Sequence, residues 1–185
     1  MLSFADFEEK TINRTELFHG KIIDVFLDDV SLPNGGTAKR ELVFHPGGVG
    51  IIAITPENKM LFVKQFRKPL EKVILEIPAG KIDPGEGDHP AVTGARELEE
   101  ETGFTAAEMK HVGSMYLSPG FSNEMLHLYH AVELTKVENP RPQDEDEVLE
   151  LYALSLDEAK KAMKDGLICD AKTMYAITYW ELLQK

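Results

Sequence analysis

The segment from Gly80 to Phe104 constrains this chain more than any other part of its 185 residues. Its second half, residues 96–104, reads RELEEETGF. Pro90 lies six residues before it and suits the first turn of a helix, and Gly103 suits the end of a helix. On that helix Glu97 and Glu101 lie one above the other, because residues four apart share a face. The sequence therefore predicts a helix that ends before Gly103 and carries stacked carboxylates.

The predicted helix also has an apolar flank. Ala91, Ala95 and Leu98 recur at helical spacing, so we expect them to face the core. Gly94 indicates either a close approach of the preceding loop or a ligand, or a tolerated imperfection. Glu100 lies beside the stacked acids, and such carboxylate oxygens suit Mg²⁺ or Mn²⁺. An acidic helix face is more often solvated surface, so the acids alone leave metal binding open.

The whole segment resembles the Nudix box, the signature of the Nudix hydrolase family. The matching positions are Gly80, Glu86, Arg96, Glu97, Leu98, Glu100, Glu101 and Gly103, with Phe104 in place of the final aliphatic residue. Nine residues separate Glu86 from Arg96, two more than in the family pattern. We place the extra residues within 87–89, where they lengthen a loop and leave the helical acids in register. The role of Glu86 is the one most affected by this insertion.

The remaining sequence predicts strands around this helix and two helices at the end. Strands are expected at 21–32, 37–45, 48–55, 60–66, 73–78, 112–117, 125–133 and 148–154, and helices at 156–164 and 171–183. Residues 33–36 indicate a hairpin turn. This order fits a mixed sheet covered on both faces.

The Nudix resemblance implies the same α/β class of fold, an α/β/α sandwich with a mixed sheet and a small N-terminal β-hairpin region. We expect residues 1–45 to form an N-terminal β region that makes a dimer, and residues 46–185 to form the Nudix hydrolase domain. Structural roles are expected for Trp180 and for the six histidines, which are spaced singly.

Charge and cysteine content limit the function classes. The net charge is −12 and no stripe of Lys or Arg is present, which argues against nucleic-acid and membrane partners. A diphosphate cannot dock against bare carboxylates, so bound divalent ions must reverse the local charge. Cys169 is the only cysteine, which fits a reducing cytoplasm, and we expect its thiol to be buried. Met1 to Lys10 lacks an apolar stretch, so we expect no secretion signal and a soluble protein.

Two further segments are similar to the ADP-ribose pyrophosphatase subgroup. Residues 64–69 (KQFRKP) and 76–80 (EIPAG) are similar to its strands before the box, and Pro119 stands sixteen positions after Gly103, a placement that implies substrate binding. The resemblance implies hydrolysis of ADP-ribose to AMP and ribose 5-phosphate, with Mg²⁺ as cofactor. Hydrolysis of other nucleoside diphosphate sugars or dinucleotides is one alternative. A non-catalytic module that senses ADP-ribose is the alternative of another class.

The resemblance also implies metal ligands. Glu97 and Glu101 are the expected main ligands of Mg²⁺, for which Mn²⁺ is a substitute. Glu100 assists them, and the main-chain carbonyl oxygen of Ala79 completes the site. Arg96 is expected either to hold Glu100 or to form a plain surface ion pair.

A catalytic base is expected from residues 144–147 (DEDE), which match the place of an acidic loop in related enzymes. Glu147 and Glu145 are the two candidates, and Glu147 is also a candidate metal ligand. Most acidic runs are solvated loops, and the sequence does not decide between these two glutamates.

Substrate contacts are expected from outside the box. Arg67 is placed to meet a phosphate, and Glu124 to hydrogen-bond a ribose or a catalytic water. Arg40 and Glu41 resemble residues that reach the adenosine end, across the interface of an expected homodimer. Phe26 is a weaker candidate for stacking on adenine. Each charged residue is equally open to interpretation as half of a structural ion pair.

Overall fold

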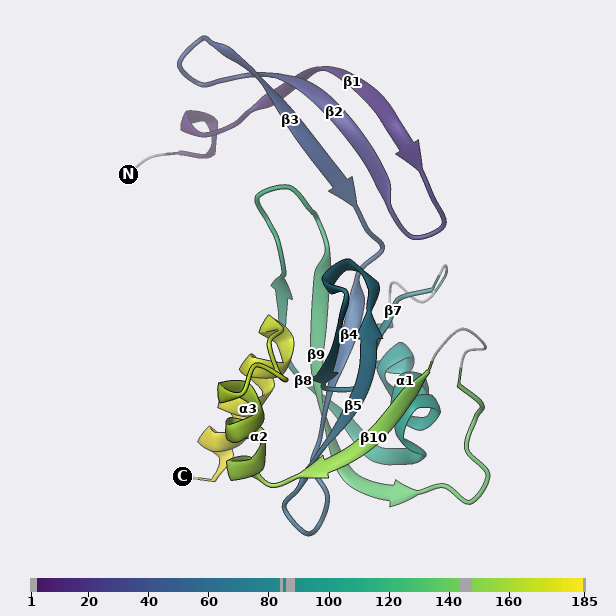
Figure 1. Cartoon of the computed structure of the whole chain (residues 1–185). Coiled ribbons are helices and arrows are strands. Elements are labelled where there is room, and N and C mark those ends of the chain that lie inside the picture. The colour runs from purple at the N-terminus through teal and green to yellow at the C-terminus, as the bar shows by residue number, and fades with distance from the viewer. Residues whose placement is uncertain (1–2, 84, 86–88, 144–147, 185) are drawn as a thin grey trace. The chain divides into compact units, whose positions relative to one another are not determined.

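The structure is a computed structural model that describes residues 3–83, 85, 89–143 and 148–184 (Figure 1). The chain divides into two compact units, one formed by Met1–Gly47 with Tyr116–Met125 and one by Gly48–Met115 with Leu126–Lys185. None of the described helices combines the length and the apolar composition that crossing a membrane requires.

The first unit contains a three-stranded antiparallel sheet in the order β1-β2-β3. Its elements are η1 (Phe4–Asp6), β1 (Lys10–His19), β2 (Asp24–Ser31) and β3 (Thr37–Phe44). The predicted hairpin at 33–36 is confirmed, since β2 pairs with β3 on either side of it. The edge strand β1 was not predicted, because all ten of its residues are exposed and leave no alternation of buried and exposed positions.

The second unit contains two sheets. The strands are β4 (Gly48–Ala53), β5 (Met60–Arg67), β6 (Lys72–Glu76), β7 (Ala79–Lys81), β8 (Phe104–Tyr116), β9 (Met125–Lys136) and β10 (Leu149–Leu154), with η2 (Lys68–Leu70) between β5 and β6. The four-stranded sheet has the order β7-β4-β9-β8, and the three-stranded sheet the order β10-β5-β6. Strand β4 runs parallel to β9 and antiparallel to β7, so the prediction of a mixed sheet is confirmed.

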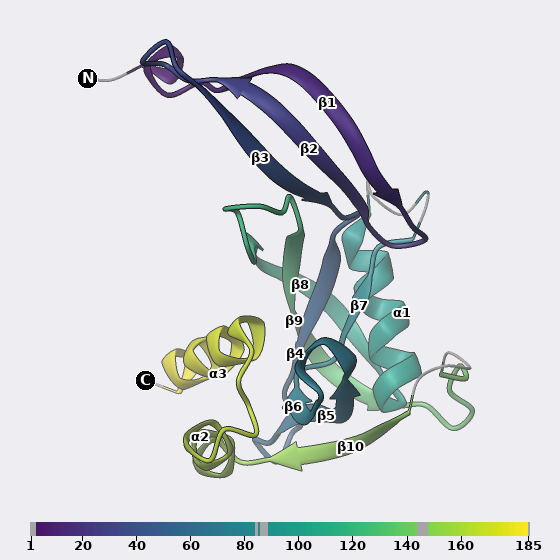
Figure 2. The ribbon, with the colours of Figure 1, turned by 45° about the horizontal axis from the view of Figure 1, so that its top comes forward.

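Three helices cover the strands of this unit from opposite sides, as Figures 1 and 2 show. They are α1 (Pro90–Thr102), α2 (Leu156–Lys164) and α3 (Ala171–Leu183). Neighbouring residues of β4 point to opposite faces: Ile51 packs in the cluster that contains Leu98 of α1, and Ile52 in the cluster that contains Trp180 of α3. The expected α/β/α sandwich is confirmed.

The ends of α2 and α3 agree with the sequence. Ser155 caps α2 and forms a capping box with Glu158, while Asp170 caps α3 by accepting a hydrogen bond of 3.0 Å from the Thr173 amide. Trp180 is buried, and its Nε1–H donates to Asn58 Oδ1 at 3.2 Å, which confirms its structural role. The expectation for Cys169 is wrong, because its thiol lies in the exposed turn between these helices.

Candidate metal and diphosphate site on helix α1

Helix α1 begins at Pro90 and is followed by Gly103, as predicted. Gly103 has a φ of 72° and its amide donates to the Glu99 carbonyl oxygen at 2.8 Å, so a left-handed residue ends the helix. The predicted apolar flank is partly wrong, because Ala95 is exposed. Thr93 and Leu98 are fully buried. Packing against the sheet determines which face of α1 is buried, and that face includes the polar residue Thr93.

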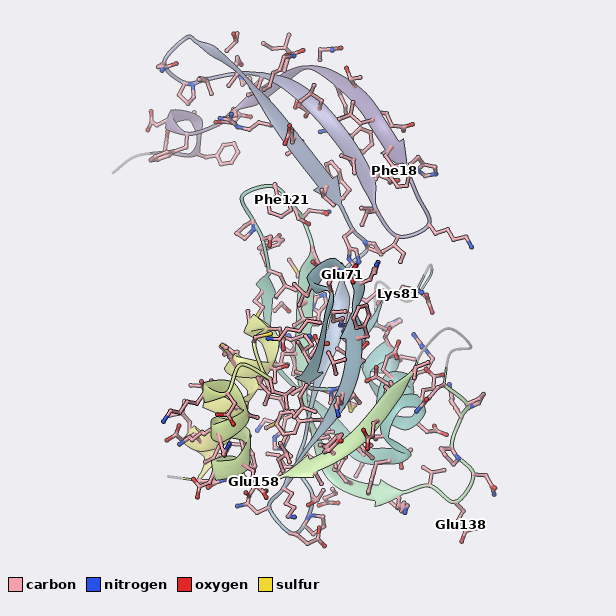
Figure 3. All side chains as sticks on the ribbon, viewed as in Figure 1. Phe18, Glu71, Lys81, Phe121, Glu138 and Glu158 are labelled. Carbon is pink, nitrogen blue, oxygen red and sulfur yellow. The ribbon has the colours of Figure 1, made fainter. Side chains whose placement is uncertain are left out.

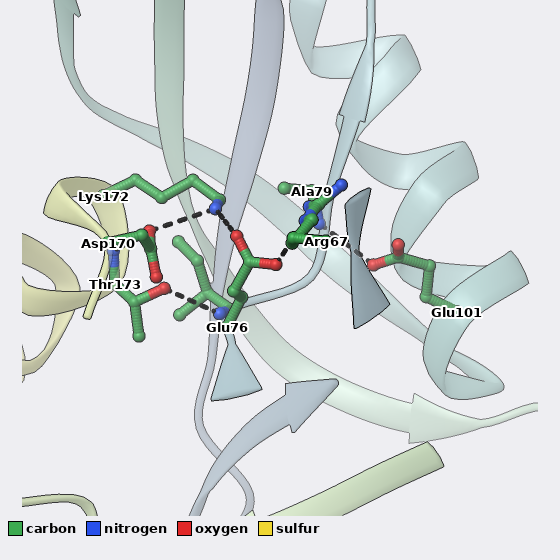
Figure 4. Close-up of polar contacts among 8 residues, drawn as sticks. Arg67, Glu76, Ala79, Glu101, Asp170, Lys172 and Thr173 are labelled. Atoms are coloured by element: carbon green, nitrogen blue, oxygen red, sulfur yellow. Dashed lines mark hydrogen bonds and ion pairs between the residues drawn. The ribbon is translucent and has the colours of Figure 1, made fainter. Parts of the chain in front are cut away.

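The stacked acids lie inside the protein. Glu97 is 8% exposed and Glu101 is 2% exposed, far less than is usual for glutamate. The amide of Ala79 donates to Glu101 Oε2 at 2.9 Å, which joins α1 to β7 (Figure 4). A buried carboxylate is costly unless it is paired. The hydrogen bond from the Ala79 amide therefore stabilises the Glu101 carboxylate on the side of α1 that faces β7.

Arg96 connects three acids. Its Nη1 lies 2.8 Å from Glu100 Oε2 and 3.0 Å from Glu97 Oε1, and its Nη2 lies 3.3 Å from Asp83 Oδ2. The Arg96 side chain is only 18% exposed, so it holds Glu100 from within the site and is not a plain surface ion pair. The Arg96 guanidinium thus lies among the acids and offsets the repulsion between like charges that are four residues apart on a helix.

Two glycines of this segment lie in crowded surroundings. A Cβ atom at Gly80 would fall 1.9 Å from Glu97 Oε1, so only glycine allows β7 to lie this close to Glu97. A Cβ atom at Gly94 would meet Met109 Cε at 3.1 Å, on the side of α1 that faces the sheet. The close approach expected at Gly94 is therefore made by a core side chain, and the box segment makes its close approach at Gly80.

A second polar cluster lies at the end of β6 (Figure 4). The buried carboxylate of Glu76 accepts a hydrogen bond of 2.6 Å from Arg67 Nε and is paired with Lys172, which also lies 3.0 Å from Asp170 Oδ1. Arg67 was predicted as a phosphate ligand, but Glu76 and Lys172 were not predicted. They lie 96 residues apart and come together only through the fold.

A hollow of about 590 Å³ borders the acids on one side. Glu100 and Glu101 line it together with Lys136, Arg141 and Leu151. Its volume lies within the range of small-molecule sites. Another cavity, of about 290 Å³, lies between α2 and the β10-β5-β6 sheet, and none of the α1 acids lines it.

The sequence of residues 44–174 matches the NUDIX domain family. This chain is a member of the Nudix family. It is 50% identical over 175 residues to the "ADP-ribose pyrophosphatase" of Bacillus subtilis, covering 95% of this chain and 94% of that protein. It is 52% identical over 176 residues to the "Methanol dehydrogenase activator" of Bacillus methanolicus, with the same shares covered.

A solved structure supports the Nudix fold. The structure described as "Crystal structure of ADP compounds hydrolase" has a TM-score of 0.83, covers 96% of this chain and 95% of its own, and is 22% identical. At that identity the likeness concerns the fold alone.

The residues of the Nudix box fit a divalent cation, which enzymes of this family generally use. The donors that α1 holds beside β7 are the carboxylate oxygens of Glu97 and Glu101, and carboxylate oxygens are ligands of hard cations. Because Gly80 has no side chain, the Glu97 carboxylate can occupy the space beside it. Among the described residues, no three His, Cys, Asp or Glu side chains are already arranged to hold one ion. Arg96 instead pairs with these acids.

Several predicted residues belong to the first unit. Arg40 donates to Glu9 through Nε at 2.8 Å and Nη2 at 2.6 Å, while Glu41 is exposed on β3. Pro119 is exposed and Glu124 half-buried. Phe26 packs edge-on against Phe44 at 5.4 Å. Glu86, Glu145 and Glu147 lie outside the described residues.

Two of the histidines, although spaced singly in the sequence, contact the same serine in the structure. His111 Nε2 lies 3.0 Å from Ser114 Oγ, and His127 Nδ1 lies 2.8 Å from the same atom. Strands β8 and β9 bring them together, so their separation of sixteen positions hides the pair.

Proposed function

We propose that this chain hydrolyses the diphosphate linkage of ADP-ribose to AMP and ribose 5-phosphate, with Mg²⁺ as its cofactor and Mn²⁺ as a substitute. The observation that carries the proposal is the pair of buried carboxylates, Glu97 and Glu101, held against the main chain of Ala79 and Gly80. The relative from Bacillus subtilis, 50% identical over nearly the whole length, supports the choice of ADP-ribose.

In the proposed site, Glu97, Glu101 and the Ala79 carbonyl oxygen hold Mg²⁺, and Glu100 assists them. When bound, this ion supplies positive charge that stabilises the charge developing on the diphosphate. Arg96 holds Glu100 and Glu97 in place. The buried surroundings strengthen each of these interactions, because little water screens them.

Hydrolysis requires a base that takes a proton from the attacking water. The oxygen of this water forms the new bond to phosphorus, while the bond from phosphorus to the bridging oxygen breaks. Glu147 or Glu145 is proposed to accept the proton, and Glu147 also to bind the metal. Both lie outside the described residues, so these assignments rest on the family resemblance.

Substrate contacts are proposed for five residues outside the Nudix box. In the second unit Arg67 binds a phosphate, because its guanidinium is partly exposed and has N–H groups beyond the one that Glu76 accepts. In the first unit Arg40, Glu41, Pro119 and Glu124 are proposed to contact the adenosine and ribose parts of the substrate. These four assignments rest on the resemblance to the ADP-ribose pyrophosphatase subgroup.

A homodimer in the cytoplasm is proposed as the working form. The first unit exposes apolar side chains, among them Phe18 at 52% and Phe121 at 54% (Figure 3). Its strand β1 is an edge strand with Ile12 and Leu17 exposed as well. An exposed apolar edge strand favours pairing with a second chain. The single cysteine fits a reducing compartment.

A second candidate function is the activation of a dehydrogenase. It is favoured by the relative from Bacillus methanolicus, which is 52% identical and named as an activator of methanol dehydrogenase. The two candidates are compatible if activation depends on hydrolysis. Adding wild-type protein and Glu101→Gln protein to a methanol dehydrogenase assay separates hydrolysis-dependent activation from activation by binding alone.

A substrate panel tests the main proposal. Purified protein is incubated with Mg²⁺ and with ADP-ribose, GDP-mannose, UDP-glucose or NADH, and the products are separated by chromatography. ADP-ribose is expected to give the highest kcat/KM, with AMP as a product. Equal rates on all four compounds would remove the assignment of ADP-ribose, and binding without turnover would support the sensing alternative.

A further inference from the structure

Glu76 is a buried carboxylate that two cations share. It is 3% exposed; its Oε2 accepts from Arg67 Nε at 2.6 Å and its Oε1 pairs with Lys172 Nζ. Figure 4 shows Arg67 and Lys172 approaching the carboxylate from opposite sides. Each oxygen therefore has its own cation, and the carboxylate plane is held by both.

The far end of this network is buried as well. Lys172 is 9% exposed and lies at the start of α3, where Asp170 Oδ1 is 3.0 Å from its Nζ. Arg67 and Lys172 together balance the charges of Glu76 and Asp170. Removal of Lys172 would leave the buried charge of Glu76 without full compensation, which is strongly destabilising. The ion pair with Lys172 therefore fixes the position of the Glu76 carboxylate.

Arg67 is the exposed end of the network. Its side chain is 38% exposed, and the contact with Glu76 is made through Nε. Within the part of the chain that the structure describes, its two Nη groups have no hydrogen-bond partner. An Nε contact fixes the guanidinium plane and leaves the N–H groups on the Nη atoms for a second anion. Such a fork suits bidentate binding of phosphate.

We propose that Glu76 and Lys172 are positioning residues that orient the Arg67 guanidinium toward a phosphate of the substrate. This inference rests on the proposed function and deepens it. Neither residue touches the substrate: Lys172 holds Glu76, and Glu76 holds Arg67. The N-terminus of α3 therefore contributes to diphosphate binding from the opposite side of the strands to α1.

The same end of α3 also holds the chain between Glu76 and the metal site. The amide of Ile77 donates to Thr173 Oγ1 at 3.0 Å, and the amide of Ala79 donates to Glu101 at 2.9 Å. Between them, the carbonyl oxygen of Pro78 accepts from the Ile51 amide at 2.8 Å. One short segment thus connects the phosphate-orienting network with the carboxylates of α1.

A double-mutant cycle tests the positioning role. Binding of the non-cleavable α,β-methylene analogue of ADP-ribose is measured by calorimetry in Mg²⁺ for wild type, Glu76→Gln, Arg67→Ala and the double variant. Glu76→Gln is expected to weaken binding about ten-fold when Arg67 is present. It is expected to weaken binding less than about two-fold in the Arg67→Ala background, because the residue that it positions is then absent.

Equal loss in both backgrounds would overturn the positioning role, since a structural defect does not depend on Arg67. If wild type binds the analogue and cleaves ADP-ribose, such a result removes this inference alone. If wild type does neither, the proposed function itself is removed. Thermal unfolding of all four proteins separates lost stability from lost binding.

Lys172 supplies a second test if Glu76→Gln fails to fold. Lys172→Met keeps a long buried side chain and is expected to raise KM with a smaller effect on kcat, while Lys172→Arg restores most of the binding. The matched control is Lys160→Gln, which removes an ion pair of 2.8 Å between α2 and α3. The control is expected to leave KM unchanged, and an equal rise in KM for Lys160→Gln and Lys172→Met would contradict the proposal.

Discussion

The α-carbon of Gly80 on β7 faces the carboxyl group of Glu97 on α1 at a distance that leaves no room for a side chain. A Cβ atom there would lie 1.9 Å from Glu97 Oε1 and 2.0 Å from its Cδ. Gly80, the first residue of the box, and Glu97, the first acid of α1, therefore pack directly against each other. The preceding residue, Ala79, donates its amide hydrogen bond to Glu101. The two carboxylates keep their spacing because β7 lies directly against them.

Gly80→Ala is expected to displace the Glu97 carboxylate while leaving the fold intact. Glu97 is a proposed metal ligand, and a displacement of about 1 Å in an active site costs roughly 100-fold in rate, so kcat/KM for ADP-ribose is expected to fall by about that factor. Gly113→Ala is the matched control, because a Cβ atom at Gly113 meets nothing within 4 Å. Steady-state kinetics of both variants make the comparison, and unchanged kcat/KM in Gly80→Ala would refute the packing argument.

Glu101→Gln is expected to abolish turnover while the protein stays folded. The glutamine carbonyl oxygen still accepts the hydrogen bond that Ala79 N–H gives at 2.9 Å, so the link between α1 and β7 is kept. The negative charge is lost, and we expect kcat to fall by more than about 100-fold. Circular dichroism and thermal unfolding check the fold. Wild-type turnover in this variant would remove the role of the stacked acids.

Local signals explain why α1 could be predicted closely. Pro90 and Gly103 mark its ends, and the spacing of Glu97 and Glu101 places both acids on one face without reference to the rest of the chain. The buried face was harder to predict. Thr93 is fully buried and Ala95 is exposed, because the direction in which α1 packs on the sheet depends on Met109, Tyr129 and other distant residues.

The parts of the site that sequence reasoning missed depend on long-range contacts. Lys172 stands in a helix whose pattern indicates only packing, and its contact with Glu76 spans 96 positions. Strand β7 has three residues, too few for a periodic signal. Gly80 was identified from its place in the box, but its physical reason is the distance to Glu97, which no pattern in the sequence contains.

Thr173→Val is expected to destabilise the protein by about 1–3 kcal/mol, because it leaves the buried Ile77 amide without an acceptor. Thr173 is fully buried, and valine matches its shape, so the lost hydrogen bond is the main change. Thr178→Val in the same helix is the control. Its hydroxyl is exposed and bonds the Met174 carbonyl oxygen at 2.9 Å, so its replacement is expected to cost less than about 0.5 kcal/mol.

Urea unfolding of both threonine variants measures the free energies. Equal destabilisation by Thr173→Val and Thr178→Val would contradict the claim that Thr173 Oγ1 holds the segment before β7. A loss confined to Thr173→Val, with reduced activity at temperatures where the protein is folded, supports the connection of α3 with the proposed metal site.

Two histidines on β9 are expected to make stability depend on pH. Burial lowers the pKa of His127, with a further contribution from His111, and burial with the charge of Lys110 lowers the pKa of His130. The unfolded state therefore binds more protons than the native state once the pH falls below the unfolded value of about 6.5. The stabilisation is complete above that pH and is lost as the pH falls toward the lowered native pKa values.

The free energy of unfolding is thus expected to decrease when the pH is lowered from 7.5 to 5.5, a window of roughly two units in which most carboxylates stay ionised. Urea unfolding at several pH values measures this slope. His130→Gln is expected to reduce the slope, and the double variant with His127→Gln to reduce it further, since each removes one group that protonates preferentially in the unfolded state. An unchanged slope in the double variant would show that burial of these imidazoles does not control stability.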